Sequence, residues 1–517
     1  MKYKVLAGAI LSLYAYQSSA QEHIIQRPEQ RWLRLAEEQF TQGHYRLAAQ
    51  STRQYLEEYS KTSLLRAADA EEKAEYIRTV SDLKLVTEGS EDSAKNFIAA
   101  ASNPAYIQRA SFALAQYYFR KEELVKAIPY YESANISNLT NEEIAAAKFE
   151  LAYAYFNSKQ FDKAEPLFAS IKEVPGKYYL AGNYYYGLLA YNESKYDEAL
   201  TSFKRVDNEK QYRNIVPYYV AEIYYFKGDR KKALEEAIRL TRRPEKLYYD
   251  KELHLLAAQV LFEEQRYGEA LPYFEHYYEA TDEIRKEELY EMAYSYYRVN
   301  EWKNAIEKFK PLSNSQDSLG QTAMYLLGDC YLKINDKKSA RNAFSICADM
   351  PYNKGQQEAS LLLYGKLSYD MGYHDDAIRS FRALVVEFPE SVHSSEARTM
   401  LSDLLVKTNK YEEAYEALRN VTARNSDYYR VQQKVTYGYA MKELATGNLG
   451  FADSLLTLSL ERPMDGLYEA AAQFWKGEIA YRQNRFADAT RYLRQFTENK
   501  DSRYAQAVSP QATASNA

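Results

Sequence analysis

A short phrase recurs along the chain at a nearly constant interval. An aromatic or apolar residue is followed three positions later by Ala, and Phe or Leu lies four positions after that Ala. Phe161, Ala164 and Phe168 form the clearest copy. Clear further copies centre on Ala199, Ala270, Ala305, Ala414 and Ala489, and weaker ones on Ala48, Ala94, Ala127, Ala233, Ala340, Ala377 and Ala452. From Ala127 onward these residues lie 34 to 38 positions apart, which indicates a repeat array rather than one central core.

A second small residue stands twelve positions before almost every one of these Ala residues. We call it the first small residue of its repeat and the Ala the second small residue. The first small residues are Ala36, Ala115, Ala152, Gly187, Ala221, Ala258, Ala293, Gly328, Gly365, Ser402, Ala440 and Gly477. Only in the Ala94 copy does a larger residue, Asp82, take this place. Two antiparallel helices approach closely where both lack bulk, so the spacing predicts a helical hairpin in each repeat.

The composition agrees with an all-α chain. A chain of 517 residues exceeds what one hydrophobic core usually organises, and an array that grows along one axis avoids that limit. Only 18 Gly and 13 Pro interrupt the helix-forming residues, and no alternating, turn-bounded stretches typical of strands stand out.

The paired small residues resemble those of the tetratricopeptide repeat, whose second helix carries Tyr-x-x-Ala-x-x-x-Phe. The resemblance covers residues 28–500 and departs from the family mainly in longer linkers. It implies an α-solenoid of about 12–13 hairpins, wound as a right-handed superhelix with a concave groove. The Ala94 copy is either a further repeat or an irregular hairpin.

Both ends of the chain differ from the array. Residues 1–20 have the basic start, apolar run and small residues of a secretory signal, although a membrane anchor is the alternative. No Cys lies near Gln21, where cleavage is expected, so we expect an exported, unlipidated protein of the periplasm, either free or peripheral to the outer membrane. Residues 501–517 are either a low-complexity tail or the point where a longer array is cut.

The charge of the chain argues against a nucleic-acid partner. Removal of Lys2 and Lys4 lowers the basic count from 67 to 65 against 72 acidic residues, a net charge of −7. A basic cluster between repeats is either a site for acidic partners or a solvated linker, and the linker is the favoured interpretation. It consists of Arg239, Arg242, Arg243 and Lys246.

The sequence offers no motif of a metal, cofactor or catalytic site. The six His residues show no short ligand spacing, and the Gly-rich and nucleophile-elbow motifs are absent. We therefore expect no enzyme, no cofactor and no metal. The only cysteines, Cys330 and Cys347, lie on consecutive predicted helices and are either a disulfide or, as we favour, small buried residues at a helix interface.

Tyrosine is the unusual residue type, with 52 copies. In the tetratricopeptide family, the groove is lined by first-helix positions fifteen, eleven and eight residues before the second small residue. This resemblance gives a candidate partner-binding set of Tyr153, Tyr184, Tyr191, Tyr218, Tyr225, Tyr290, Tyr294, Tyr297 and Tyr325. Such a stripe as a whole suits adaptable binding of an extended peptide, but any single one of its residues can instead belong to the packing between repeats.

Two binding functions follow as expectations. The first is a scaffold or adaptor of the Gram-negative cell envelope, in biogenesis or secretion, that holds a protein or peptide in the groove. The alternative is a glycan-binding, nutrient-capture protein on a similar helical scaffold. An enzyme would require a further domain beyond Ala517.

Overall fold

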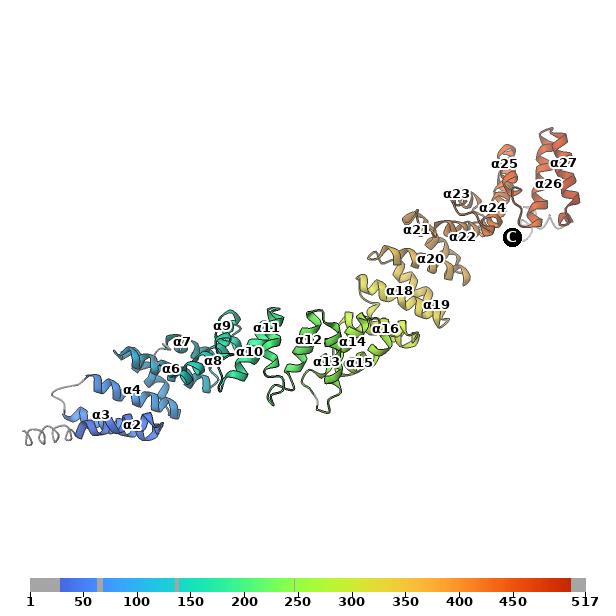
Figure 1. Cartoon of the computed structure of the whole chain (residues 1–517). Helices are drawn as coiled ribbons and strands as arrows, with labels where there is room; N and C mark the ends of the chain where they lie inside the picture. The colour runs from blue at the N-terminus through green and yellow to red at the C-terminus, as the bar shows by residue number, and fades with distance from the viewer. Residues whose placement is uncertain (1–27, 63–67, 135–138, 246, 504–517) are drawn as a thin grey trace, which may run out of the picture. The chain divides into compact units, whose positions relative to one another are not determined.

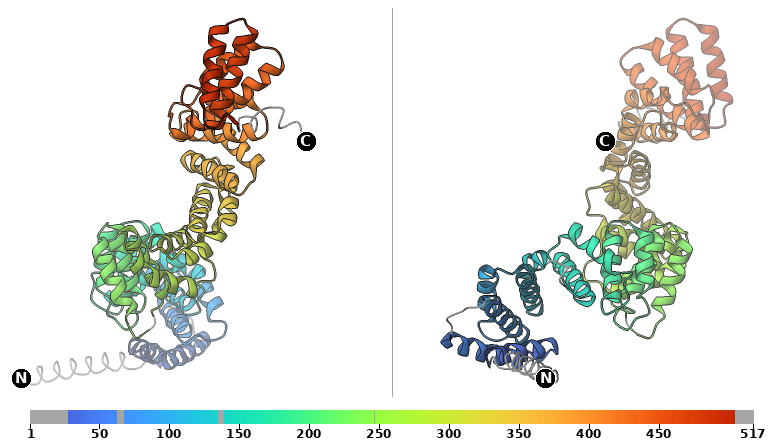
Figure 2. Two further views of the ribbon diagram at one scale, coloured as in Figure 1. Left: turned by 90° about the vertical axis from the view of Figure 1, so that its right-hand side faces the viewer. Right: turned by 60° about the vertical axis from the view of Figure 1, so that its left-hand side comes forward.

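The computed structural model of this chain describes residues 28–62, 68–134, 139–245 and 247–503. The predicted signal segment, residues 1–20, and residues 504–517 of the predicted tail lie outside this range. All regular secondary structure of the described residues is helical, in 26 helices that form thirteen consecutive pairs (Figures 1 and 2). The prediction of an all-α solenoid of 12–13 hairpins is thus confirmed.

The contacts divide the chain into two compact units, and the division falls inside helix α14, between Leu253 and His254. The first unit contains α2 (Pro28–Thr41), α3 (Tyr45–Thr62), α4 (Ala68–Leu85), α5 (Ser90–Ala100), α6 (Pro104–Arg120), α7 (Leu124–Ser133), α8 (Asn141–Asn157), α9 (Phe161–Ile171), α10 (Tyr179–Asn192), α11 (Tyr196–Lys204), α12 (Val216–Phe226), α13 (Arg230–Thr241) and the start of α14 (Asp250–Glu263). The second unit continues with α15 (Tyr267–Ala280), α16 (Lys286–Arg298), α17 (Trp302–Leu312), α18 (Ser318–Lys333), α19 (Lys337–Ala348), α20 (Lys354–Asp370), α21 (His374–Glu387), α22 (Ser394–Lys407), α23 (Tyr411–Arg419), α24 (Ser426–Ala445), α25 (Leu449–Ser459), α26 (Gly466–Arg482) and α27 (Phe486–Glu498).

Each hairpin holds its two small residues at its core. All thirteen second small residues are buried, and Ala94 is among them, so the weakest copy of the phrase also marks a true hairpin, α4–α5. Asp82 of that hairpin is only partly buried and forms an ion pair with Arg53 at 3.2 Å. The predicted single repeat domain over residues 28–500 stays a prediction.

Close packing at the helix crossing explains the glycines among the first small residues. A Cβ atom on Gly187, Gly328 or Gly365 would lie 2.5–2.8 Å from a ring carbon of Phe203, Phe344 or Phe381. Each Phe follows its second small residue by four positions. The repeat spacing predicts this large residue one turn away from the crossing, but its ring lies directly against the first helix, and the glycine provides the space for it.

The turn inside each hairpin has one fixed conformation. In all thirteen hairpins the residue five positions before the second small residue has a positive φ of 58–87°. At Lys159, the backbone N–H bonds to the carbonyl of Phe156 at 3.0 Å, and the next N–H, of Gln160, reaches Tyr155 at 2.9 Å. These two bonds close the first helix in the manner of a Schellman motif.

Buried amides organise several longer linkers between repeats. Gln433 on α24 donates to the carbonyl of Asp465 at 2.9 Å and accepts from the backbone N–H groups of Met464 and Asp465 at 2.9 and 2.8 Å. Gln321 on α18 binds the backbone of Met350 and Asn353 in the same way. One side chain thereby satisfies the polar backbone of the next linker.

The two cysteines are buried and free, as the favoured interpretation held. Cys330 lies on α18 and Cys347 on α19, where the Cys347 thiol donates to the carbonyl of Gln321 at 3.6 Å. Burial raises the pKa of the Cys330 thiol to about 12. Among the described residues, no helix combines the length and apolarity needed to cross a bilayer.

Candidate binding groove

The nine candidate tyrosines are all partly buried, which places them between a core and a free surface. They lie on first helices, namely α8, α10 and α12 in the first unit and α16 and α18 in the second. Each unit therefore carries its own row of them. Their partial burial is compatible both with the packing between repeats and with a groove, so the two alternatives for this stripe stay predictions.

In the first unit, these rings contact aromatic residues of the adjacent repeat. Tyr184 stacks on Tyr212 with centroids 4.7 Å apart, and Tyr218 lies 4.6 Å from Tyr249. Tyr153 meets Tyr185 of the next hairpin edge-on at 5.4 Å. Much of this row therefore serves the packing between repeats.

Hydroxyl groups of the row bond to acidic residues of the following repeat. Tyr191 donates to Glu222 at 2.6 Å, and Tyr297 donates to Asp329 at 2.9 Å. In both cases the tyrosine lies eight residues before the second small residue of its own repeat. The acidic residue lies eleven residues before the second small residue of the following repeat. Desolvation together with these carboxylates raises the pKa of both phenols.

A third contact of this kind joins Tyr369 on α20 to Asp403 on α22 at 2.7 Å. Tyr369 obeys the spacing that selected the candidate set, although the set omitted it. At these three positions the hydroxyl is thus bonded to a carboxylate of the following repeat.

In the second unit, three candidate tyrosines form a continuous stack on α16. Tyr290 and Tyr294 have centroids 5.8 Å apart, and Tyr294 and Tyr297 follow at 5.9 Å. Arg298 donates to the Tyr294 hydroxyl at 3.1 Å. Burial raises the pKa of Tyr290 to about 12. Tyr325, on α18, packs edge-on against Phe344 at 5.9 Å.

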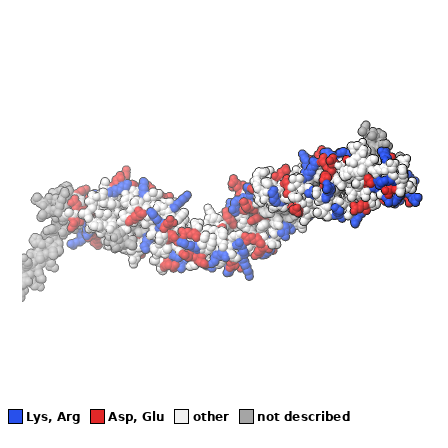
Figure 3. All heavy atoms as spheres, turned by 90° about the horizontal axis from the view of Figure 1, so that it is seen from above, with Lys and Arg blue, Asp and Glu red and all other residues white. Residues whose placement is uncertain are grey.

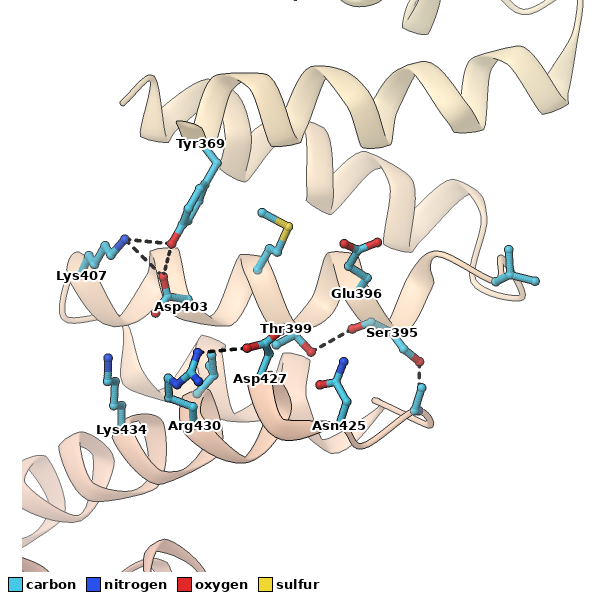
Figure 4. Close-up of a pocket in the computed structure, with 14 residues that line it drawn as sticks. Tyr369, Ser395, Glu396, Thr399, Asp403, Lys407, Asn425, Asp427, Arg430 and Lys434 are labelled. Carbon is cyan, nitrogen blue, oxygen red and sulfur yellow. Dashed lines mark hydrogen bonds and ion pairs between the residues drawn. The ribbon is translucent and has the colours of Figure 1, made fainter. Parts of the chain in front are cut away.

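A cavity lies further along the same unit, over the first helices α20, α22 and α24 (Figure 4). It has a volume of about 710 Å³ and is open to solvent. Its lining consists of Tyr369, Val392, Ser395, Glu396, Thr399, Met400, Asp403, Lys407, Ala423, Asn425, Asp427, Arg430, Val431 and Lys434. We call this cavity the α22 groove.

Most charges around the α22 groove are already paired. Lys407 contacts both Asp403, at 3.2 Å, and the Tyr369 hydroxyl, at 3.2 Å (Figure 4). Arg430 pairs with Asp427 at 3.0 Å (Figure 4), and Glu396 pairs with Lys366 at 2.7 Å. Lys434 is different, because no ion pair or hydrogen bond to it is found within the described ranges, and its side chain is partly buried.

Apolar side chains complete the α22 groove. Val392 is 87% exposed at its rim, while Met400 is partly buried and Val431 is buried. A groove of this composition offers apolar contact for side chains and one ammonium for a carboxylate. The sequence argument missed it because only aromatic residues were considered at the groove positions, although Thr399 and Asp403 occupy two of them.

Two residues of the basic cluster between repeats are already bonded within the chain. Arg239 pairs with Glu236 at 2.5 Å, and Arg243 donates to the carbonyl of Arg213 at 3.4 Å. Lys246 lies outside the described residues. On the face drawn in Figure 3, acidic and basic residues are interspersed rather than gathered into one field.

Family models for helical repeats match three segments of the chain. Residues 221–283 and 395–428 match two models of the tetratricopeptide repeat. Residues 263–347 match the model of anaphase-promoting complex, cyclosome, subunit 3. No curated protein matches the chain.

Solved structures of helical-repeat proteins are similar at low identity. The C-terminal part of a tetratricopeptide-repeat protein from Cytophaga hutchinsonii is 16% identical, with 48% of this chain and 98% of that chain covered and a TM-score of 0.37. A tetratricopeptide-repeat protein from Parabacteroides merdae is also 16% identical, with 48% and 93% covered and a TM-score of 0.27. The Cut9–Hcn1 hetero-tetramer is 14% identical, with 93% and 88% covered and a TM-score of 0.24. At these identities and TM-scores, the likeness says nothing of function.

Proposed function

Since this chain is a tetratricopeptide-repeat protein, we propose that it is a non-enzymatic scaffold that holds a protein partner as an extended segment in the α22 groove. Repeats of this family serve in general as protein-binding scaffolds, and an open cavity on their first helices supports that role here.

One observation carries the proposal, namely the composition of the α22 groove. Lys434 supplies an ammonium without a protein partner among the described residues, and Met400, Val392 and Val431 supply apolar area beside it. A peptide with an acidic side chain next to an apolar one fits this combination. The ammonium then gains a charge-assisted hydrogen bond that it lacks in the free protein.

Location in the cell envelope is the second part of the proposal. The basic, apolar and small-residue segments of residues 1–20 support export, and the absence of Cys near Gln21 supports an unlipidated mature protein. We place the scaffold in the periplasm of a Gram-negative bacterium, either free or peripheral to the outer membrane, in envelope biogenesis or secretion.

The groove is tested with a matched pair of variants on helix α24. Lys434→Gln removes the ammonium inside the groove, whereas Lys442→Gln removes one outside it that pairs with Glu412 at 3.4 Å. Wild-type protein and Lys442→Gln should capture the same partner from envelope extracts, and Lys434→Gln should bind a peptide of that partner about ten-fold more weakly. Circular dichroism melts verify that all three proteins are folded.

Several results would overturn the proposal. Capture of the same proteins by Lys434→Gln with unchanged affinity removes the groove from the mechanism. Saturable binding to a glycan array that depends on Lys434, without protein capture, supports the glycan-binding alternative instead. Export is tested separately by fusing residues 1–25 to alkaline phosphatase, which should be active only if the segment directs the enzyme out of the cytoplasm.

A further inference from the structure

Two histidines that are distant in sequence meet in the hairpin formed by α14 and α15. The imidazole rings of His254 and His276 stack with centroids 3.7 Å apart and an angle of 22° between their planes. His254 is partly buried and His276 is exposed. No short sequence motif indicates this pair, because the two residues are 22 positions apart and only the antiparallel hairpin brings them together.

A carboxylate belongs to the same group of side chains. Asp250 lies one helical turn before His254 on α14, so both project from one face of that helix. One ligand atom from each of Asp250, His254 and His276 lies within 4.8 Å of the others. Two imidazole nitrogens and one carboxylate oxygen form a donor set that is common in protein zinc sites.

We propose that His254 and His276, with Asp250, bind a divalent transition-metal ion of the zinc type. Imidazole nitrogen favours such ions over Mg²⁺ and Ca²⁺, which prefer ligand sets made of oxygen. Ligand bonds of about 2.0–2.2 Å require donor atoms roughly 3.3 Å apart, so the ligand atoms, which lie within 4.8 Å of one another, need to approach by at most about 1.5 Å. The two stacked rings must also turn out of their nearly parallel arrangement so that a nitrogen lone pair of each points at the ion, and the exposed His276 side chain provides that movement by rotation about its torsion angles.

Three protein ligands leave one position of a tetrahedral ion for water. The site is therefore open to solvent, and the metal bridges the two helices of one hairpin. Such an ion stabilises the folded chain because the ligands are not held together after unfolding. The inference is independent of the proposed groove, since it uses none of the groove residues.

The experiment uses the untagged full chain after treatment with a chelator. Isothermal titration with Zn²⁺ should show one saturable site, and Co²⁺ bound there should give the visible absorption of a low-symmetry complex. Zn²⁺ should also raise the melting temperature, while Mg²⁺ at equal concentration should not. His254→Gln and His276→Gln should each weaken zinc binding at least ten-fold, and Asp250→Asn should weaken it less.

Two further variants serve as controls for the zinc-binding experiment. His374→Gln removes an exposed histidine of α21 and should bind zinc as the wild type does. His276→Cys replaces one zinc ligand with another and should retain the site. The proposal fails if the wild-type chain shows no saturable zinc site, or if either His→Gln variant binds zinc as tightly as the wild type.

Discussion

At the scale of single residues, polar groups on the first helices differ widely in their surroundings. Tyr191, Tyr297 and Tyr369 donate their hydroxyls to carboxylates, whereas Lys434 keeps an ammonium without a partner among the described residues. Groups already satisfied by the fold contribute to its stability, and unsatisfied ones gain most from a ligand. This distinction, rather than the number of tyrosines, separates packing from binding.

Glu291 on α16 provides a residue-scale prediction about pH. Burial raises the pKa of its carboxyl to about 7, although Gln259 donates a hydrogen bond to it at 3.3 Å. The folded chain therefore holds this proton up to about pH 7, while the unfolded chain loses it near the ordinary value of 4.5. A rise in pH through that window lowers the free energy of unfolding.

We expect Glu291→Gln to remove this effect. The free energy of unfolding of the variant minus that of the wild type should be about 1–3 kcal/mol larger at pH 8 than at pH 5. Urea unfolding of both proteins at the two pH values measures it, and their difference cancels the other titrating groups. An equal difference in stability at pH 5 and pH 8 would show that Glu291 ionises normally in the folded chain.

At the scale of helices, the hairpin is defined by its crossing. The ring of Phe381 on α21 fills the space that Gly365 leaves on α20, and Leu418 has the corresponding position opposite Ser402 in the next hairpin. In these two hairpins the larger first small residue faces the smaller partner. At the crossing of α20 and α21 the two positions are therefore coupled by volume rather than by helix propensity.

Gly365→Ala tests this coupling, because helix propensity and packing predict opposite changes in stability. Helix propensity alone predicts that the change stabilises the chain by about 1 kcal/mol. The new Cβ would lie 2.5 Å from a ring carbon of Phe381, so we expect destabilisation of about 1–3 kcal/mol instead. Denaturant unfolding measures the change, and Phe381→Leu should recover part of it in the double variant. A more stable Gly365→Ala chain would show that the ring moves away at no cost.

At the scale of the whole molecule, the helices of each unit contact mainly the helices that are close to them in chain order. Substantial contacts within a unit join helices that are adjacent or next but one in order, so the stability of an array is close to a sum of local terms. Damage at one hairpin should consequently stay local.

Gln433→Ala tests this locality. It removes three hydrogen bonds between α24 and the linker that leads into α26, and its side chain is only 1% exposed. Hydrogen exchange followed by mass spectrometry should show loss of amide protection in α24–α27 and unchanged protection in α16–α19. Uniform loss across the second unit would indicate that it unfolds as one cooperative block.

The amino-acid sequence by itself determined the hairpins and their number. The two small residues of a repeat are twelve positions apart in one continuous segment, so helix geometry and a short turn fix their contact without help from the rest of the chain. Even the weak Ala94 copy follows this rule. The favoured interpretation of Cys330 and Cys347, as small buried residues at a helix interface without a disulfide, also agrees with the structure.

Only the tertiary structure decided which side chains meet between repeats. The linkers vary in length, so the sequence separation of two contacting residues changes from repeat to repeat. The hydrogen bonds of Tyr297 and Tyr369 join fixed positions of consecutive repeats, but this rule emerged only from the packing of one hairpin on the next. The same holds for the α22 groove, which takes its lining from three first helices. His254 and His276 lie within one hairpin, but only the side-chain packing of that hairpin shows that their rings meet. Groove composition therefore depends on contacts between repeats, whereas the hairpin fold depends on contacts within one repeat.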